Sequence, residues 1–266
     1  MKRFAILCAA LMSMLLPTLA GAGSTENAAK KLPVADVAAF ADNLERDLAA
    51  RGANVAIVAR VGRDRETLPH GIDYTHVAYW VFSQMTRQDG STYRGYRVYN
   101  LYQQAGDDTV SRLVQDSPAD FFAGAFVLDA GVIIPDKRLQ KKLLGVIGSP
   151  AYAQLHNARY SVLANPASPT FQNCTEHTLD VLMASLYGTT DKVQIKANIN
   201  AHFDPHTVQI GSLKRLFAPA SSAALTTADH GRDITTATFG SLARFMAEHD
   251  LAQQIYRYTP YKAQSF

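Results

Sequence analysis

The chain has 266 residues, of which 47% are hydrophobic and 18% are charged, and its formal net charge is +3. This length and apolar content suffice to build a sizeable core in one domain without disulfide bonds, which excludes the class of small disulfide-rich proteins. The 26 basic residues are scattered rather than gathered into one stripe, which argues against a nucleic-acid partner.

The first 22 residues have the features of a cleavable signal peptide. Lys2 and Arg3 precede an apolar run over residues 4–19, and the small residues at 20–22 offer a cleavage site. An uncleaved membrane anchor is the alternative, but the run is short and contains Pro17. No later stretch approaches the roughly 18 apolar residues that span a bilayer, so we predict no transmembrane segment after cleavage. The sequence therefore predicts a periplasmic or secreted protein.

The predicted domain follows a short leader. Residues 23–35 are small, polar and charged, as is typical of a flexible leader, and residues 36–266 form the predicted single α+β domain. Removal of residues 1–22 takes away two basic and no acidic residues and leaves a formal net charge of +1. It also removes Cys8, so Cys174 stays as a lone cysteine that cannot form an intramolecular disulfide.

The first half of the predicted domain contains one helix and a β-hairpin. Apolar residues at three- and four-residue steps predict a helix over 37–51, with Asp36 as its N-cap. The run 53–61 is rich in Val, Ile and Ala and predicts a buried strand. The aromatic and β-branched runs 76–82 and 96–102 predict an antiparallel hairpin.

The second half is richer in helices. The further predicted elements are, in order, a helix that starts at Ser117-Pro118, a strand over 131–134, a helix over 136–146, a helix start at Ser149-Pro150, a strand over 160–164, a helix over 174–187, short helices near 211–217 and 238–248, and a final strand with exposed Tyr256, Tyr258 and Tyr261. The helix over 174–187 is the best supported, because it carries one apolar stripe and Gly188 follows it as a stop.

Cys174 lies where a reactive thiol is commonly placed. In the segment 173–177 the thiol stands in the first turn of a predicted helix, where unpaired N–H groups favour the thiolate. A thiol nucleophile needs a base and a group that orients this base. His76 and Asn100 lie on the two strands of the predicted hairpin and could supply them. The alternative is a small buried core cysteine with a structural histidine.

A metal site is the next candidate. His202, Asp204 and His206 offer three ligands in five residues, and Glu176-His177 or His230 could complete a zinc site. The spacing matches no strong metal signature, and Pro205 indicates a turn. We therefore predict no metal and no cofactor.

Three short patches resemble the permuted NlpC-type branch of the papain-like thiol hydrolases. The segments 75–77, 98–101 and 173–177 hold, in that order, a histidine that opens a strand, a polar residue on the next strand, and an Asn-Cys pair at a helix start. This resemblance implies an α+β fold with a central antiparallel sheet and packed helices in a permuted papain-like topology. It also implies the catalytic set Cys174, His76 and Asn100. A generic α/β sandwich is the alternative fold.

A broader region resembles an uncharacterised secreted bacterial domain-of-unknown-function family (DUF2145-like). The resemblance covers residues 74–187 and rests on the segment 74–77, the pair Phe121-Phe122, and the segment 171–173. This family implies no established activity.

The sequence thus supports two hypotheses of different classes. The first is a cell-envelope cysteine hydrolase or acyltransferase that acts on an amide or ester, with a cell-wall peptide or a lipid acyl group as substrate. The second is a non-catalytic periplasmic binding or structural protein that keeps the fold without the activity. The placement of Cys174 relative to His76 separates them.

Overall fold

A seven-stranded, fully antiparallel sheet forms the centre of the protein. The computed structural model describes residues 31–209, 224–261 and 263–265. The strands in the sheet run in the order β4-β3-β2-β1-β5-β8-β9. Their bounds are β1 Val55–Val61, β2 His76–Thr86, β3 Thr92–Gln104, β4 Asp107–Asp116, β5 Val127–Pro135, β8 Ala252–Tyr258 and β9 Ala263–Ser265, while β6 His206–Thr207 and β7 Thr235–Thr236 pair separately.

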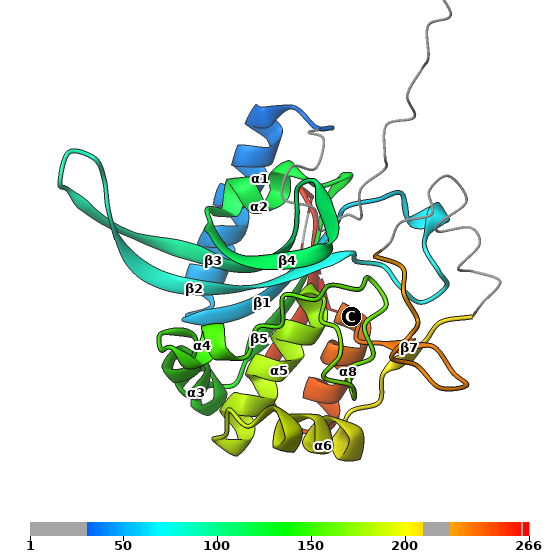
Figure 1. Cartoon of the computed structure of the whole chain (residues 1–266). Coiled ribbons are helices and arrows are strands. Elements are labelled where there is room, and N and C mark those ends of the chain that lie inside the picture. The colour runs from blue at the N-terminus through cyan, green and yellow to red at the C-terminus, as the bar shows by residue number, and fades with distance from the viewer. Residues whose placement is uncertain (1–30, 210–223, 262, 266) are drawn as a thin grey trace, which may run out of the picture.

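Helices cover both faces of this sheet. Their bounds are α1 Val34–Ala50, α2 Pro118–Ala123, α3 Lys137–Ile147, α4 Ala151–Gln154, α5 Cys174–Tyr187, α6 Lys192–His202 and α8 Phe239–Glu248, with a short 3-10 helix at Arg65–Thr67. Figure 1 shows α1 and α2 on one side of the sheet and α3, α5 and α8 on the other. The expected α+β class with a central antiparallel sheet and packed helices is confirmed. Within the described ranges, no helix is long and apolar enough to cross a membrane.

Alternation along the strands divides the core into two layers. Ile57, Val77 and Tyr79 point to the side of α5, whereas Val58 and Trp80 point to the side of α1 and α2. Successive side chains of a strand face opposite sides, and here both sides are covered. This explains why all seven residues of β1 are buried and why its sequence, apart from Arg60, is apolar without alternation.

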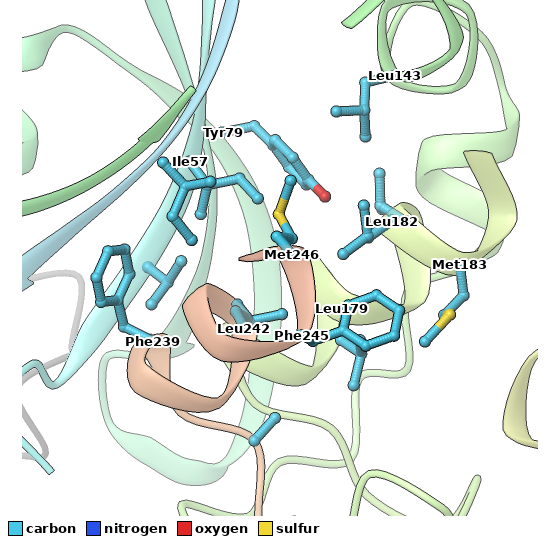
Figure 2. Close-up of a cluster of buried hydrophobic side chains, with 14 of the residues drawn as sticks. Ile57, Tyr79, Leu143, Leu179, Leu182, Met183, Phe239, Leu242, Phe245 and Met246 are labelled. Carbon is cyan, nitrogen blue, oxygen red and sulfur yellow. The ribbon is translucent and has the colours of Figure 1, made fainter. Parts of the chain in front are cut away.

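The larger core layer fixes the position of α5. Leu179 and Leu182 of α5 meet Leu242 and Met246 of α8 beneath the sheet residue Tyr79 (Figure 2). The Tyr79 hydroxyl donates a hydrogen bond of 2.8 Å to the backbone carbonyl of Thr178, inside α5. Packing and this bond hold the helix against β2, and they hold its first residue, Cys174, near the same strand.

Several predicted elements differ from the structure. The N-cap of α1 is Pro33, and Asp36 lies in the first turn instead. Residues 160–164 form no strand, since only an isolated bridge joins Tyr160 to Gln172. The helix after Ser149 is a single turn whose N-cap is Pro150. Tyr256 and Tyr258 of β8 are not exposed as expected: Tyr256 is only 4% exposed and its hydroxyl donates to Asp47 of α1, and Tyr258 is half-buried against Phe40.

The remaining expectations divide into two groups. The hairpin is confirmed as β2 and β3, and the helix predicted over 238–248 is confirmed as α8. The predicted signal peptide and the short helix near 211–217 lie outside the described residues.

Candidate functional site

Cys174 is the first residue of α5, as predicted. Asn173 is the N-cap, and its side-chain oxygen accepts a hydrogen bond of 2.9 Å from the backbone N–H of Glu176. The helix ends at Gly188, which adopts φ +67°, a conformation that favours glycine. The local sequence therefore sets both ends of the helix and places the thiol in its first turn.

His76 and Asn100 are in direct contact, also as predicted. His76 Nε2 lies 3.0 Å from Asn100 Oδ1, and Asn100 Nδ2 donates a hydrogen bond of 2.9 Å to Asp116 Oδ2. The imidazole stacks on the ring of Tyr102 with 4.8 Å between centroids and an interplanar angle of 13°. It also packs against Phe121 of α2, so its ring is held by packing and by one polar partner.

The sulfur of Cys174 lies against the edge of β2. The backbone N–H of Val77 lies close enough to the sulfur to favour its thiolate, and the Thr175 hydroxyl lies 3.9 Å away. The β2–β3 ladder begins at the pair Tyr79 and Tyr99, so Val77, two residues earlier in β2, lies outside it. The sulfur thus contacts the strand where β3 no longer pairs with it, at the residue that follows His76.

The thiol and the imidazole approach this edge from different sides. His76 contacts Phe121 on the α2 side of the sheet, whereas Cys174 packs with Leu101 and Tyr160 on the α5 side. Among the described residues, Nδ1 of His76 has no hydrogen-bond partner, and the sulfur is therefore not bonded to it. The three predicted site residues therefore lie around the same end of β2. His76 contacts Asn100, but Cys174 does not contact His76.

Burial controls the charge of both groups. Desolvation lowers the pKa of His76 well below its usual value, the Arg60 cation lowers it further, and the Asn100 contact opposes them. Desolvation also raises the pKa of Cys174, against the N–H groups of Val77 and Thr175 and the Arg60 cation. The helix start was expected to favour the thiolate, but burial outweighs it here, so the resting pair is a neutral thiol and a neutral imidazole.

Arg60 belongs to the site, although sequence reasoning missed it. It lies directly across from His76 in the β1–β2 register and is 1% exposed. Its guanidinium donates to the carbonyl of Phe121 and lies 5.2 Å from the centre of the Phe121 ring. A Cβ on Gly124 would stand 2.9 Å from Arg60 Nη2, so the glycine leaves room for this cation. An arginine inside an apolar strand run was the one available signal.

A second buried polar cluster joins α5 to α6. Lys196 Nζ donates to Glu176 Oε1 at 2.6 Å and to Asp180 Oδ1 at 2.8 Å. Gln172 Nε2 donates to Asp180 Oδ2 at 2.7 Å. Burial raises the pKa of Glu176 well above its usual value, and the Lys196 cation opposes this. Glu176 and Asp180 lie in the first two turns of α5, so the cluster joins the N-terminal part of this helix to α6.

The candidate metal ligands are dispersed. His202 stacks on Tyr187 with 6.0 Å between ring centroids, and Asp204 forms an ion pair of 2.9 Å with Arg244. His230 Nε2 lies 2.7 Å from the carbonyl of Leu163. Over residues 31–209 and 224–261, no group of three or more His, Cys, Asp or Glu side chains could hold a metal ion.

Fold and site together define a class: an α+β domain with an antiparallel sheet between two helical layers and a buried thiol beside a His-Asn pair. The chain belongs to a bacterial family described as "Uncharacterized protein conserved in bacteria (DUF2145)", whose model matches residues 47–246. This confirms the broader of the two resemblances. Neither the curated proteins nor the solved structures contain a match to the chain.

Proposed function

We propose that this protein is a cell-envelope cysteine hydrolase or acyltransferase that acts on an amide or ester bond. One observation carries the proposal. Cys174 Sγ lies beside the backbone N–H of Val77, which directly follows His76, and His76 is in turn in hydrogen-bond contact with Asn100. The base and its orienting group are therefore in contact, and the nucleophile lies at the same strand end without touching the base.

In the proposed reaction, the sulfur attacks the substrate carbonyl while His76 Nδ1 accepts the thiol proton. The developing oxyanion accepts hydrogen bonds from backbone N–H groups near Cys174. The carbon bond to the leaving oxygen or nitrogen breaks, and the leaving group takes the proton from His76, which produces a thioester. Water, or an acceptor alcohol or amine, then attacks the thioester, and its proton passes through His76 to the departing sulfur.

The resting charges define what the first proton transfer must overcome. A neutral imidazole is unprotonated at neutral pH and has a free site for a proton, but its lowered pKa and the raised pKa of Cys174 both oppose the transfer while the two groups stay buried. The imidazole and the sulfur must first come into hydrogen-bond contact, and catalytic contacts often tighten only when substrate is bound.

The chain order supports a permuted papain-like topology. The base on β2 and the orienting residue on β3 precede the nucleophile on α5, which is the order of the permuted NlpC-type branch. We further propose that residues 1–22 direct export and that the enzyme acts in the periplasm or outside the cell. Its substrate there would be a cell-wall peptide or a lipid acyl group.

Turnover on envelope material tests this function. Purified wild-type protein would be incubated separately with peptidoglycan fragments and with phospholipid vesicles, and products would be identified by mass spectrometry. We expect cleavage or transfer in one of the two reactions, and its loss in Cys174→Ala and in His76→Gln. Products that persist in Cys174→Ala would overturn the proposal.

A non-catalytic binding protein is the second candidate, and two observations favour it. Cys174 is only 5% exposed and its sulfur is not bonded to His76. A cavity of about 230 Å³ lies elsewhere, lined by residues that include Tyr74, Thr238 and Phe239. Under this hypothesis the Cys174→Ala variant binds envelope peptides as the wild type does, and neither protein changes them.

A further inference from the structure

Asp116 is in contact with the orienting residue of the site. It is the last residue of β4, and its Oδ2 accepts the hydrogen bond of 2.9 Å from Asn100 Nδ2. The Tyr102 hydroxyl also lies near this carboxylate and helps to stabilise its charge, while the Tyr102 ring stacks on His76. One carboxylate therefore contacts both residues that hold the imidazole.

The hydrogen bonds that link Asp116, Asn100 and His76 determine which atom donates and which accepts at each step. An ionised carboxylate can only accept hydrogen bonds, so Asn100 must turn its NH₂ group to Asp116 and its oxygen to His76. An amide oxygen also only accepts, so His76 Nε2 must carry the proton of the neutral ring. His76 Nδ1 is then the unprotonated nitrogen, and it has no partner among the described residues.

We propose that Asp116 is a positioning residue of the site: through Asn100 it sets the tautomer of His76 and leaves Nδ1 free to accept a proton. The role in catalysis rests on the proposed function, because it matters only if Nδ1 accepts the proton of Cys174. The setting of the tautomer stands on the hydrogen bonds alone and can be measured separately.

Sequence reasoning had no means to find this residue. Asp116 ends an edge strand whose pattern is mostly polar, and it precedes the Ser117 cap, so it resembles an ordinary turn residue. In the β3–β4 register Asp116 pairs with Val98, which lies two residues before Asn100 on β3. Only this pairing places Asp116 diagonally across from Asn100.

The test is to measure the His76 tautomer by long-range ¹⁵N–¹H NMR at neutral pH. We expect the wild-type ring to carry its proton on Nε2, and we expect a mixture of tautomers in Asp116→Asn, where the new side chain can also donate. Asp120→Asn is the matched control, because Asp120 is an exposed carboxylate bonded to Ser117 and not to Asn100. This control should keep the wild-type tautomer.

A second readout links the tautomer to chemistry. Acylation of Cys174 by p-nitrophenyl acetate, followed by intact mass, should slow by roughly tenfold or more in Asp116→Asn and stay unchanged in Asp120→Asn. A wild-type ring protonated on Nδ1, or an unchanged tautomer in Asp116→Asn, would overturn the inference about Asp116. Wild-type protein that is never acylated at Cys174 would instead overturn the proposed function, whatever the tautomer. If Asp116→Asn fails to fold, the wild-type spectrum alone still decides the tautomer.

Discussion

The backbone N–H of Val77 faces the sulfur of Cys174 closely enough to favour its thiolate. This contact lies where β2 extends beyond its pairing with β3, and it brings the start of α5 to the strand residue next to His76. A single backbone group therefore connects the nucleophile of the proposed site with the element that carries its base.

The reactivity of Cys174 toward a simple alkylating agent should reflect its burial. Because desolvation raises the pKa of the thiol, the rate of iodoacetamide labelling should be low at neutral pH and rise only above the usual thiol pKa of about 8.5. Arg60→Met should move the midpoint higher still, since it removes a cation that favours the thiolate. A labelling midpoint below pH 8 in the wild type would contradict this account of the resting site.

Acid should destabilise the fold through its buried histidines. Burial lowers the pKa of His177 to about 3, and that of His76 falls well below its usual value. A group whose pKa is depressed in the folded state contributes stability that is present above its unfolded pKa and lost as the pH falls. For His177 this loss should run from about pH 6.5 to about pH 3 and be of the order of 5 kcal/mol.

Urea unfolding at a series of pH values would measure this loss. His177→Gln should flatten the decline in the free energy of unfolding over that range. An equally steep decline in the variant would show that His177 is not its source.

Lys196 should matter more for stability than an exposed lysine. Lys196→Met would leave Glu176 and Asp180 buried together without their cation, at a cost of roughly 3–5 kcal/mol. Lys141→Met on α3, where the side chain is exposed, is the control and should change little. Thermal unfolding of the two variants checks this, and equal shifts in Tm would refute it.

Two glycines of the chain should respond oppositely to alanine. Gly124→Ala would place a methyl group against the Arg60 guanidinium and should cost about 1–3 kcal/mol. Gly145 lies on the exposed side of α3 with open space around it, so Gly145→Ala should stabilise the helix by up to about 1 kcal/mol. Denaturant unfolding compares them. If Gly124→Ala left the free energy of unfolding unchanged, the Arg60 guanidinium would not be confined against Gly124.

The sequence allowed prediction of the parts that local chemistry controls. The bounds of α5 follow from the Asn173 cap and the Gly188 stop, and the β2–β3 hairpin follows from its aromatic and β-branched runs. The contact of His76 with Asn100 followed in turn from the hairpin, because adjacent strands bring such side chains together.

Other features depend on tertiary contacts that no local pattern encodes. Strand β4 lies at the sheet edge and alternates weakly, so its polar sequence did not distinguish it from a loop. Cys174 is buried because Tyr160 and Ala224, which are distant in the sequence, pack on it. That burial reversed the expected direction of its pKa shift, since a helix start favours the thiolate only while water can reach it.

The dependence of Cys174 acylation on His76 tests the central claim most directly. Wild-type protein and His76→Gln would be mixed with p-nitrophenyl acetate at pH 7, and the rate at which one acetyl group appears on Cys174 would be followed by intact mass and peptide mapping. We predict that the wild type is acylated at Cys174 and that the rate in the variant falls about 100-fold or more. Equal rates in the two proteins, with both still folded, would contradict the claim that the thiol and the imidazole act together.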